Sequence, residues 1–312
     1  MSIREVALAL GGGGIRGIAH IGVIRCLEDH GYVIKAVAGT SAGGLVGSVY
    51  AAGYSTQEIE KAARNLGKNP SFKRTSHDKP SLLGVSGITK LLLDMLGETK
   101  IEDFPIPFVA TAVSLNSGHE IILNKGKAVD AVLATIAIPG ILPVQEIGGK
   151  ILMDGGVLDP VPVKAVRGLD PSLPILAVIL YQKPTDHKDS LVPLPFTNVF
   201  PSTVIEQISK LRLVEALKIF ARSVEVATQK LSEFSLIMDK PDVVIAPQVG
   251  HYALLDQVDP DALIEEGYRA TLAVLPKVEK ACSGLKSLQR RIRYGVSLSE
   301  KQSGRESIDP DS

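Results

Sequence analysis

Short runs of aliphatic and β-branched residues recur along the chain and alternate with segments in which apolar positions repeat at helical spacing. The clearest of these runs, which predict strands, are residues 5–10, 33–39, 108–115, 175–180 and 242–247. Strands that alternate with helices are typical of an α/β protein with a largely parallel sheet. We therefore predict an α/β fold built on such a sheet.

Helices, turns and loops complete this pattern. The predicted helices cover residues 15–30, a segment that begins at Ser41, and residues 127–137, 202–231 and 260–282. Gly31 is expected to cap the first helix, and Pro139 is expected to stop the third. One further apolar run, residues 119–124, is expected to pair with the strand before it across a tight turn. Two segments rich in proline, glycine and serine, residues 67–87 and 182–202, are predicted loops.

The composition suits one large globular domain, because 45% of the 312 residues are hydrophobic. We place this domain at residues 5–283. Polar residues dominate residues 284–312, and we expect a disordered tail there. The 34 basic and 34 acidic residues give a formal net charge of zero, so no nucleic acid is expected as a partner.

Two features of the sequence bear on where the protein works. The chain has two cysteines, Cys26 and Cys282, too few for a disulfide framework, which favours a reducing setting. The N-terminal apolar run is too short for a signal peptide, and nowhere do about 18 apolar residues run together. We therefore expect a cytoplasmic protein without a signal peptide or transmembrane segment, peripheral at a membrane at most.

A glycine cluster lies between the first predicted strand and the first predicted helix. It contains the pattern Gly12-x-Gly14-x-x-Gly17, which suggests a dinucleotide-binding loop. That loop requires an acidic residue at the end of the next strand, where this chain has Ala-Gly-Thr-Ser instead. Successive glycines leave the backbone N–H groups free to converge on an anion. The cluster therefore suits an oxyanion hole or a phosphate cradle, and a purely structural turn is the third interpretation.

The second predicted strand ends in a Gly-Thr-Ser-Ala-Gly pentapeptide with Ser41 at its centre. A serine between a strand and a helix suits a nucleophile elbow, in which the serine adopts a strained backbone conformation. The sharp turn requires small neighbours, and Gly39, Ala42, Gly43 and Gly44 supply them. Ser41 is therefore a candidate nucleophile, and the alternative is a serine that only caps the following helix.

A serine nucleophile requires a base. A triad of Ser41, Asp154 and His251 fits the order of an α/β-hydrolase, but the elbow of that fold normally follows several strands rather than the second. The other histidines after Ser41, at positions 77, 119 and 187, lie in loop or hairpin contexts. Asp154 is the remaining candidate, because a short apolar run leads it into a turn formed by Gly155 and Gly156.

Three motifs in this order resemble those of the patatin-like phospholipase family. They are GGGIRG at residues 12–17, GTSAG at residues 39–43 and DGG at residues 154–156. The similarity includes AIPGILPV at residues 137–144 and extends over about residues 5–280. The chain departs from many members at Val113, where they have an acidic residue.

The resemblance implies a three-layer α/β/α fold with a central, mostly parallel sheet, and a serine acyl hydrolase with a Ser–Asp dyad. Ser41 would attack the ester carbonyl, Asp154 would accept its proton, and Arg16 would anchor the glycine loop. The N–H groups of Gly12, Gly13 and Gly14 would form the oxyanion hole. The other motif glycines are Gly17, Gly39, Gly43, Gly155 and Gly156. The implied partner is a lipid acyl ester, with transient contact to a membrane surface and with no cofactor or metal. The alternative is a nucleotide-binding regulatory protein that uses the glycine loop for phosphate.

One predicted loop is unusually apolar. Residues 191–201 place leucine, valine and phenylalanine among prolines. We expect this segment to line an acyl channel or to enter a lipid surface. The alternative is packing against the helix that follows it.

Overall fold

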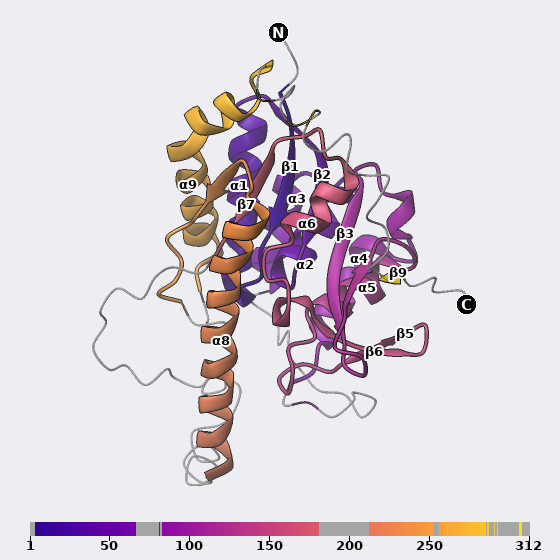
Figure 1. Ribbon diagram of the computed structural model, residues 1–312. Coiled ribbons are helices and arrows are strands. Elements are labelled where there is room, and N and C mark those ends of the chain that lie inside the picture. Colours follow the sequence, from indigo (N-terminus) through magenta and orange to yellow (C-terminus); the bar gives the residue numbers. More distant parts are fainter. Residues whose placement is uncertain are drawn as a thin grey trace.

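The structure is a computed structural model of the 312-residue chain (Figure 1). The residues that it describes are 4–66, 81, 83–180, 212–252, 256, 258–284, 286, 290, 292 and 306–307. The predicted apolar loop at residues 191–201 lies outside them, as do most of the two predicted loop segments.

The described strands form one mixed sheet. They are β1 (Arg4–Leu10), β2 (Tyr32–Gly39), β3 (Phe108–Ser114), β4 (Glu120–Leu123), β5 (Gln145–Ile147), β6 (Lys150–Asp154), β7 (Ile175–Val178), β8 (Val243–Ile245) and β9 (Glu306–Ser307). Their order is β5-β6-β3-β2-β1-β7-β8, while β4 pairs with β3, and β9 pairs with β4. The five strands β3, β2, β1, β7 and β8 run parallel, whereas β4 and β6 pair with β3 in the antiparallel sense. The five apolar runs and the pairing of residues 119–124 are thus confirmed.

The described helices are α1 (Ala19–Asp29), α2 (Ala42–Ala51), α3 (Thr56–Leu66), α4 (Ser86–Leu96), α5 (Ala128–Thr135), α6 (Val163–Leu169), α8 (Arg212–Asp239) and α9 (Pro260–Ala281). A 3₁₀ helix over residues 14–18 precedes α1, so the first turn of the predicted helix is wound more tightly than expected. Gly31 follows α1 with φ of +75°, as a C-terminal glycine should, and α5 ends before Pro139. The helix predicted to end at residue 231 continues to Asp239, and the predicted start at residue 202 lies outside the described residues.

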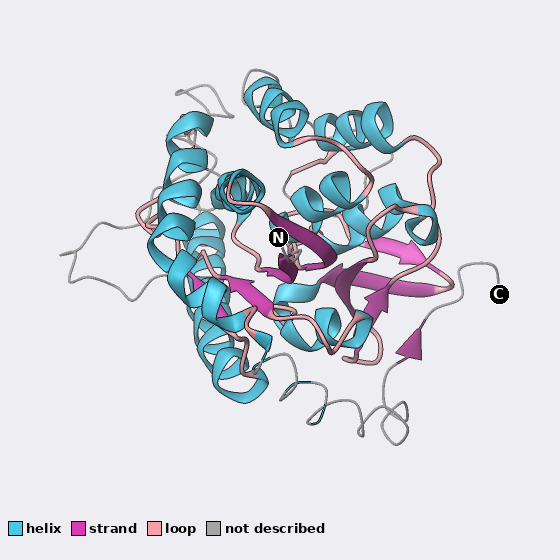
Figure 2. Ribbon diagram, turned by 90° about the horizontal axis from the view of Figure 1, so that it is seen from above, coloured by secondary structure: helices cyan, strands magenta, loops and turns pink. Residues whose placement is uncertain are grey.

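Helices cover both faces of the sheet, which is plain from above in Figure 2. Alternate residues of β1 point to opposite faces, as a strand requires. Val6, Leu8 and Leu10 join the larger core beneath α1, α2, α5 and α9, while Ala7 and Ala9 join a smaller core beneath α6. The small alanines let α6 lie close to the sheet, with α8 packed outside it. This arrangement confirms the predicted three-layer α/β/α fold.

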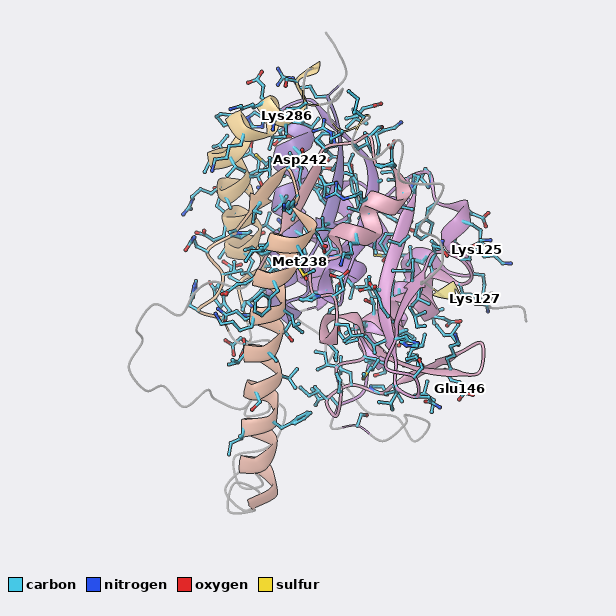
Figure 3. All side chains as sticks on the ribbon, in the orientation of Figure 1. Lys125, Lys127, Glu146, Met238, Asp242 and Lys286 are labelled. Carbon is cyan, nitrogen blue, oxygen red and sulfur yellow. The ribbon has the colours of Figure 1, made fainter. Side chains whose placement is uncertain are left out.

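The expectation that the chain beyond residue 284 does not pack is wrong at Arg290. The Arg290 side chain is 6% exposed and donates to Asp242 Oδ1 at 2.9 Å (Asp242 is labelled in Figure 3). It also donates to the backbone carbonyls of Ser172 and Ala281. An ion pair and hydrogen bonds of a buried guanidinium, rather than apolar side chains, attach this position to the domain, and apolar content could not indicate them.

Candidate active site

The three glycine motifs meet where the parallel strands end. The sheet pairs Gly39 of β2 with Ala110 of β3, and Ala112 of β3 with Asp154 of β6. The chain that leaves β2 and the chain that leaves β6 therefore emerge close together on the two sides of β3. The glycine loop after β1 lies beside them, because β1 pairs with β2 up to Gly39.

Ser41 forms the sharp turn between β2 and α2. Its φ of +55° and ψ of −124° lie in a backbone region that residues other than glycine rarely adopt. A Cβ atom at Gly39 would overlap the backbone of Gly43, and one at Gly43 would overlap the carbonyl of Leu10. The turn thus requires both glycines. The Ser41 N–H donates to Thr135 Oγ1 at 2.9 Å, and the side chain is buried.

Asp154, at the end of β6, is buried and lies beside Ser41. The Ser41 hydroxyl donates to its carboxylate, and the Gly156 N–H donates to Asp154 Oδ1 at 2.7 Å. Burial raises the pKa of Asp154 to about 6, because the charged form is poorly solvated, and the two hydrogen bonds lower it in part. This carboxylate is therefore a stronger base than an ordinary aspartate.

The glycine loop lies against the serine. A Cβ atom at Gly12 would be 3.3 Å from Ser41 Cβ, so a side chain there would crowd the serine. The Gly12 N–H donates to the Pro160 carbonyl at 3.0 Å. The expectation that Gly12 offers its N–H to an oxyanion is therefore wrong, since that donor already has a partner within the fold. Gly14 has φ of +59°, a conformation that glycine adopts without strain.

Two buried side chains hold this loop in place. Arg16 donates from Nε to the Gly13 carbonyl at 3.0 Å, and its guanidinium reaches Glu225 of α8 at 3.2 Å. His20 of α1 donates from Nε2 to the Gly11 carbonyl at 2.8 Å. Burial lowers the pKa of His20 to about 4, so its ring is neutral. The sequence indicated a packed helix residue at His20, which its burial confirms, but a histidine inside a helix gives no sign of contact with a loop.

Three fully buried threonines, Thr40, Thr111 and Thr135, also surround the site and were missed. Thr135 accepts the Ser41 N–H. The Thr40 and Thr111 hydroxyls are 2.7 Å apart, and Thr40 Oγ1 donates to the Asp159 carbonyl at 2.8 Å. These residues lie on different elements, so no local motif could reveal them.

The histidines proposed as alternative bases lie elsewhere or outside the described residues. His251 is exposed, and its ring packs on Tyr252 with the ring centroids 4.1 Å apart. His119 is also exposed, and residues 77 and 187 are not described. The hydrogen bond from Ser41 to Asp154 involves no histidine. Within the described ranges, no group of three His, Cys, Asp or Glu side chains is suited to hold a metal ion.

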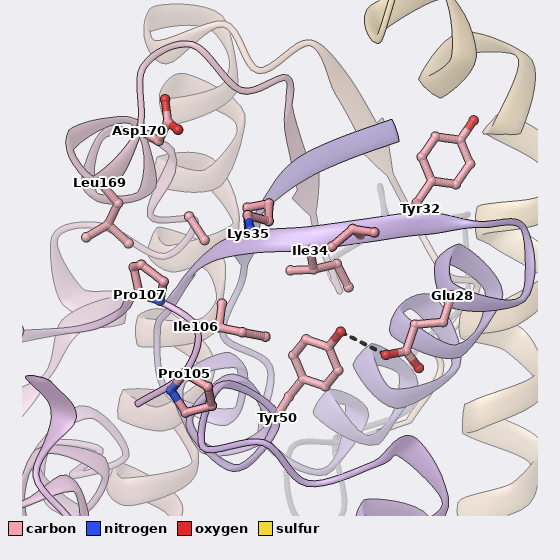
Figure 4. Close-up of a pocket in the computed structure, with 12 residues that line it drawn as sticks. Glu28, Tyr32, Ile34, Lys35, Tyr50, Pro105, Ile106, Pro107, Leu169 and Asp170 are labelled. Atoms are coloured by element: carbon pink, nitrogen blue, oxygen red, sulfur yellow. Dashed lines mark hydrogen bonds between the residues drawn. The ribbon is translucent and has the colours of Figure 1, made fainter. Parts of the chain in front are cut away.

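A cavity of about 570 Å³ lies at the opposite, amino-terminal ends of the strands (Figure 4). Tyr50, Ile106 and Leu169 contribute to its lining, and the Tyr50 hydroxyl donates to Glu28 at 2.8 Å. None of its lining residues belongs to the three motifs. This cavity is therefore separate from the candidate active site.

Comparison with known families and proteins places the site in context. The sequence profile of the family described as patatin-like phospholipase matches residues 8–167, just over half of the chain, and includes all three motifs.

Two relatives illustrate the similarity. An uncharacterized NTE family protein of Mycobacterium tuberculosis (strain H37Rv) is 40% identical over 177 residues, which cover 56% of this chain and 49% of that protein. Lysophospholipase NTE1 of Meyerozyma guilliermondii is 35% identical over 172 residues, which cover 54% of this chain and 12% of that enzyme. The matches thus span about half of the mycobacterial relative and a small part of the yeast enzyme.

The solved structure of VipD from Legionella pneumophila resembles this fold with a TM-score of 0.55. The similarity covers 88% of this chain and 67% of that one at 14% sequence identity. At that identity the likeness concerns the fold alone.

Proposed function

We propose that this chain, which belongs to the patatin-like phospholipase family, hydrolyses lipid acyl esters through a dyad of Ser41 and Asp154. One observation carries the proposal: a buried serine at positive φ lies beside a buried aspartate, and its hydroxyl lowers the pKa of that carboxyl group. The family is one of lipid hydrolases, and the yeast relative is named a lysophospholipase.

The reaction proceeds in two steps. Ser41 Oγ attacks the ester carbonyl carbon while Asp154 accepts the hydroxyl proton, and the C–O bond to the alcohol then breaks. Asp154 delivers the proton to the departing alcohol oxygen, which leaves an acyl group on Ser41. A water molecule then attacks the acyl carbon, Asp154 takes a proton from it, and Ser41 recovers that proton as the acid departs.

The negative charge on the carbonyl oxygen needs hydrogen-bond donors. Since the Gly12 N–H is engaged with Pro160, we assign this role to the N–H groups of Gly13 and Gly14. Arg16 positions that loop through its bond to the Gly13 carbonyl. Loss of one such donor typically lowers the rate about a hundred- to a thousandfold.

We also assign contact with a lipid surface to the N-terminal half of α8. In Figure 1 this half of the helix extends past the end of the sheet at which the motifs meet. Ile219 is 69% exposed and Phe220 is 48% exposed, and adjacent exposed apolar side chains on this projecting half of the helix suit contact with a lipid surface. No helix within the described part of the chain is long and apolar enough to cross a membrane. Peripheral contact of the enzyme with a membrane surface accords with the exposed side chains. The catalytic domain in this proposal starts near residue 5 and extends past residue 283 to include Arg290.

A fluorophosphonate probe tests the proposed chemistry, because it reacts with an activated serine. We expect labelling of the wild-type chain and hydrolysis of a short soluble ester, and loss of both in Ser41→Ala. The nucleotide-binding alternative predicts no labelling of either chain. Hydrolysis of phospholipid and lysophospholipid vesicles would then define the substrate class.

A further inference from the structure

Thr40, the residue before the candidate nucleophile, belongs to the second glycine motif and contacts the segments that carry the other two. Its N–H donates to the carbonyl of Leu10, just before the glycine loop, at 3.0 Å. Its carbonyl accepts the Gly43 N–H at 2.9 Å, which closes the turn around Ser41. Its side chain lies against the third motif, because a Cβ atom at Gly156 would be 3.7 Å from Thr40 Cγ2. Thr40 is therefore placed to set these segments relative to one another.

The hydroxyl of Thr40 has a fixed hydrogen-bond direction. Thr40 Oγ1 is 2.8 Å from the Asp159 carbonyl oxygen and 2.7 Å from Thr111 Oγ1. A carbonyl oxygen can only accept, so the single hydroxyl proton of Thr40 goes to Asp159. Thr111 must then donate to Thr40. Both hydroxyls are fully buried, where a lost partner is costly.

The two hydroxyls join the segment that carries Ser41 to the turn that follows Asp154. The Asp159 N–H donates to the Gly155 carbonyl at 2.9 Å, so Asp159 belongs to the same turn. Thr111 contacts that turn directly, because a Cβ atom at Gly155 would overlap Thr111 Oγ1 and the Thr111 carbonyl. The path from Thr40 to the aspartate turn is therefore short and continuous.

Such a link is needed because the sheet stops short of the site. Backbone pairing fixes Gly39 beside Ala110 and Asp154 beside Ala112. Ser41 and Gly155 lie beyond the paired residues, where the hydrogen bonds between strands no longer hold the backbone. We propose that Thr40 and Thr111 are positioning residues whose hydroxyls keep Ser41 within hydrogen-bond distance of Asp154. The effect on rate rests on the proposed function, whereas the effect on geometry does not.

Valine replaces threonine with nearly the same shape but without the hydroxyl. A displacement of about 1 Å in an active site can lower a rate about a hundredfold. We expect Thr40→Val to lower kcat on a soluble ester about ten- to a hundredfold, with KM changed less than about twofold. Thr111→Val leaves the bond from Thr40 to Asp159 in place and should have a smaller effect of the same kind. Thr40→Ser retains the hydroxyl and should recover most of the rate.

Thr271 provides a matched control. It is a fully buried threonine on α9 whose hydroxyl donates to the Gly267 carbonyl at 2.9 Å, and it belongs to none of the contacts described above. Thr271→Val therefore removes a comparable hydrogen bond from the core and should leave kcat within about twofold of wild type. A general loss of stability would affect this variant as well.

The ionisation of Asp154 gives a second readout that needs no activity. The bond from Ser41 lowers the pKa of Asp154, so a displaced Ser41 should let that pKa rise above its value of about 6. The experiment titrates the side-chain carboxyl ¹³C signal of Asp154 by NMR, with Asp154→Asn to assign it. Thr40→Val should move this titration to higher pH, while Thr271→Val should leave it unchanged.

The outcomes separate the two proposals. If Thr40→Val matches Thr271→Val in both kcat and the Asp154 titration, the positioning role is overturned, whether or not Ser41→Ala abolishes activity. If wild type neither hydrolyses esters nor reacts with the probe, but Thr40→Val still raises the Asp154 pKa, the positioning role stands and the proposed function fails. Should Thr40→Val not fold, Thr111→Val carries the test, and its equality with Thr271→Val in both readouts overturns the role.

Discussion

The two ends of the parallel strands differ in how they are packed. At the carboxyl ends, Ser41 has positive φ, Asp154 is buried, and glycines bring backbone segments into contact. At the amino ends lies a cavity of about 570 Å³, where the Tyr50 hydroxyl donates a hydrogen bond to the Glu28 carboxylate. The candidate chemistry therefore lies where the packing is tight, and the large cavity does not mark it.

This difference follows from what each feature requires. A residue held in a strained conformation costs about 1–3 kcal/mol and persists only where neighbours leave no alternative. A nucleophile and its base also need fixed relative positions, which close-packed backbone provides. An open cavity imposes neither constraint. Changes at the carboxyl ends should therefore have larger effects than matched changes elsewhere.

The largest effect is expected from the dyad itself. Ser41→Ala and Asp154→Asn should each lower kcat on a soluble ester by at least about a thousandfold. The double variant should lose little more than either single variant, because residues that act as a unit are not additive. Steady-state kinetics, with circular dichroism to verify folding, measure this.

His251→Ala is the control for the dyad. His251 is exposed and packs on Tyr252, so its removal should change kcat less than about threefold. The dyad would be falsified if a folded His251→Ala protein were as inactive as Ser41→Ala, since that result requires a histidine triad.

The next effect concerns close packing at the aspartate turn. Gly155→Ala should lower the free energy of unfolding by about 3 kcal/mol or more, because its Cβ atom would overlap the backbone and side chain of Thr111. Gly284→Ala, with nothing within 4 Å of the added carbon, should cost less than about 0.5 kcal/mol. Urea denaturation measures both. Equal costs would mean that the carboxyl ends are not close-packed as described.

The third effect is a dependence on pH. Asp154 must be ionised to accept a proton, so kcat/KM should fall about tenfold per pH unit below its pKa of about 6. A pH–rate profile of a soluble ester measures this limb. A midpoint near 4 would show that Asp154 is not buried during the reaction.

The raised pKa makes Asp154 a better base, but it also lowers the stability of the folded protein as the pH rises. The raised pKa of Asp154 means that the folded protein resists ionisation of this carboxyl, whereas the unfolded chain ionises near pH 4. Wild-type stability should therefore fall, relative to Asp154→Asn, as pH rises from about 4 to about 6. The difference should approach about 3 kcal/mol above pH 6, since the pKa is displaced by about two units. Urea denaturation of both proteins at pH 4 and pH 7 tests this, and a constant difference would contradict it.

Much of the fold could be predicted from the sequence, because buried positions require apolar residues and so produce recognisable apolar patterns. The five strand runs are apolar on both faces, as strands between two helical layers must be, and β1 keeps larger residues on one face and alanines on the other. The pattern did not reveal the packing of Arg290, since an ion pair attaches it. It also missed the 3₁₀ turn at residues 14–18, whose winding depends on contacts of the glycine loop.

Some residues of the candidate site could likewise be predicted from the sequence, and others could not. Ser41 and Asp154 stand in glycine-flanked turns, whose backbone demands are visible in single residues of the sequence. Thr40, Thr111 and His20 act through contacts between elements distant along the chain, and a threonine in a strand or a histidine in a helix has many possible roles. The engagement of the Gly12 N–H likewise depends on where the turn near Pro160 lies.

The smallest effect is expected at the amino ends of the strands, and it sharpens the comparison between the two ends. Tyr50→Phe removes only the hydroxyl that donates to Glu28, so it should lower the free energy of unfolding by about 1 kcal/mol. Because the Figure 4 cavity is separate from the three motifs, kcat and KM on a soluble ester should each stay within about twofold of wild type. Thr40→Val is the matched change at the carboxyl ends, since it also removes one buried hydroxyl. If Tyr50→Phe lowered kcat as much as Thr40→Val, the two ends would be coupled, and tight packing near Ser41 would not be enough to explain where the chemistry resides.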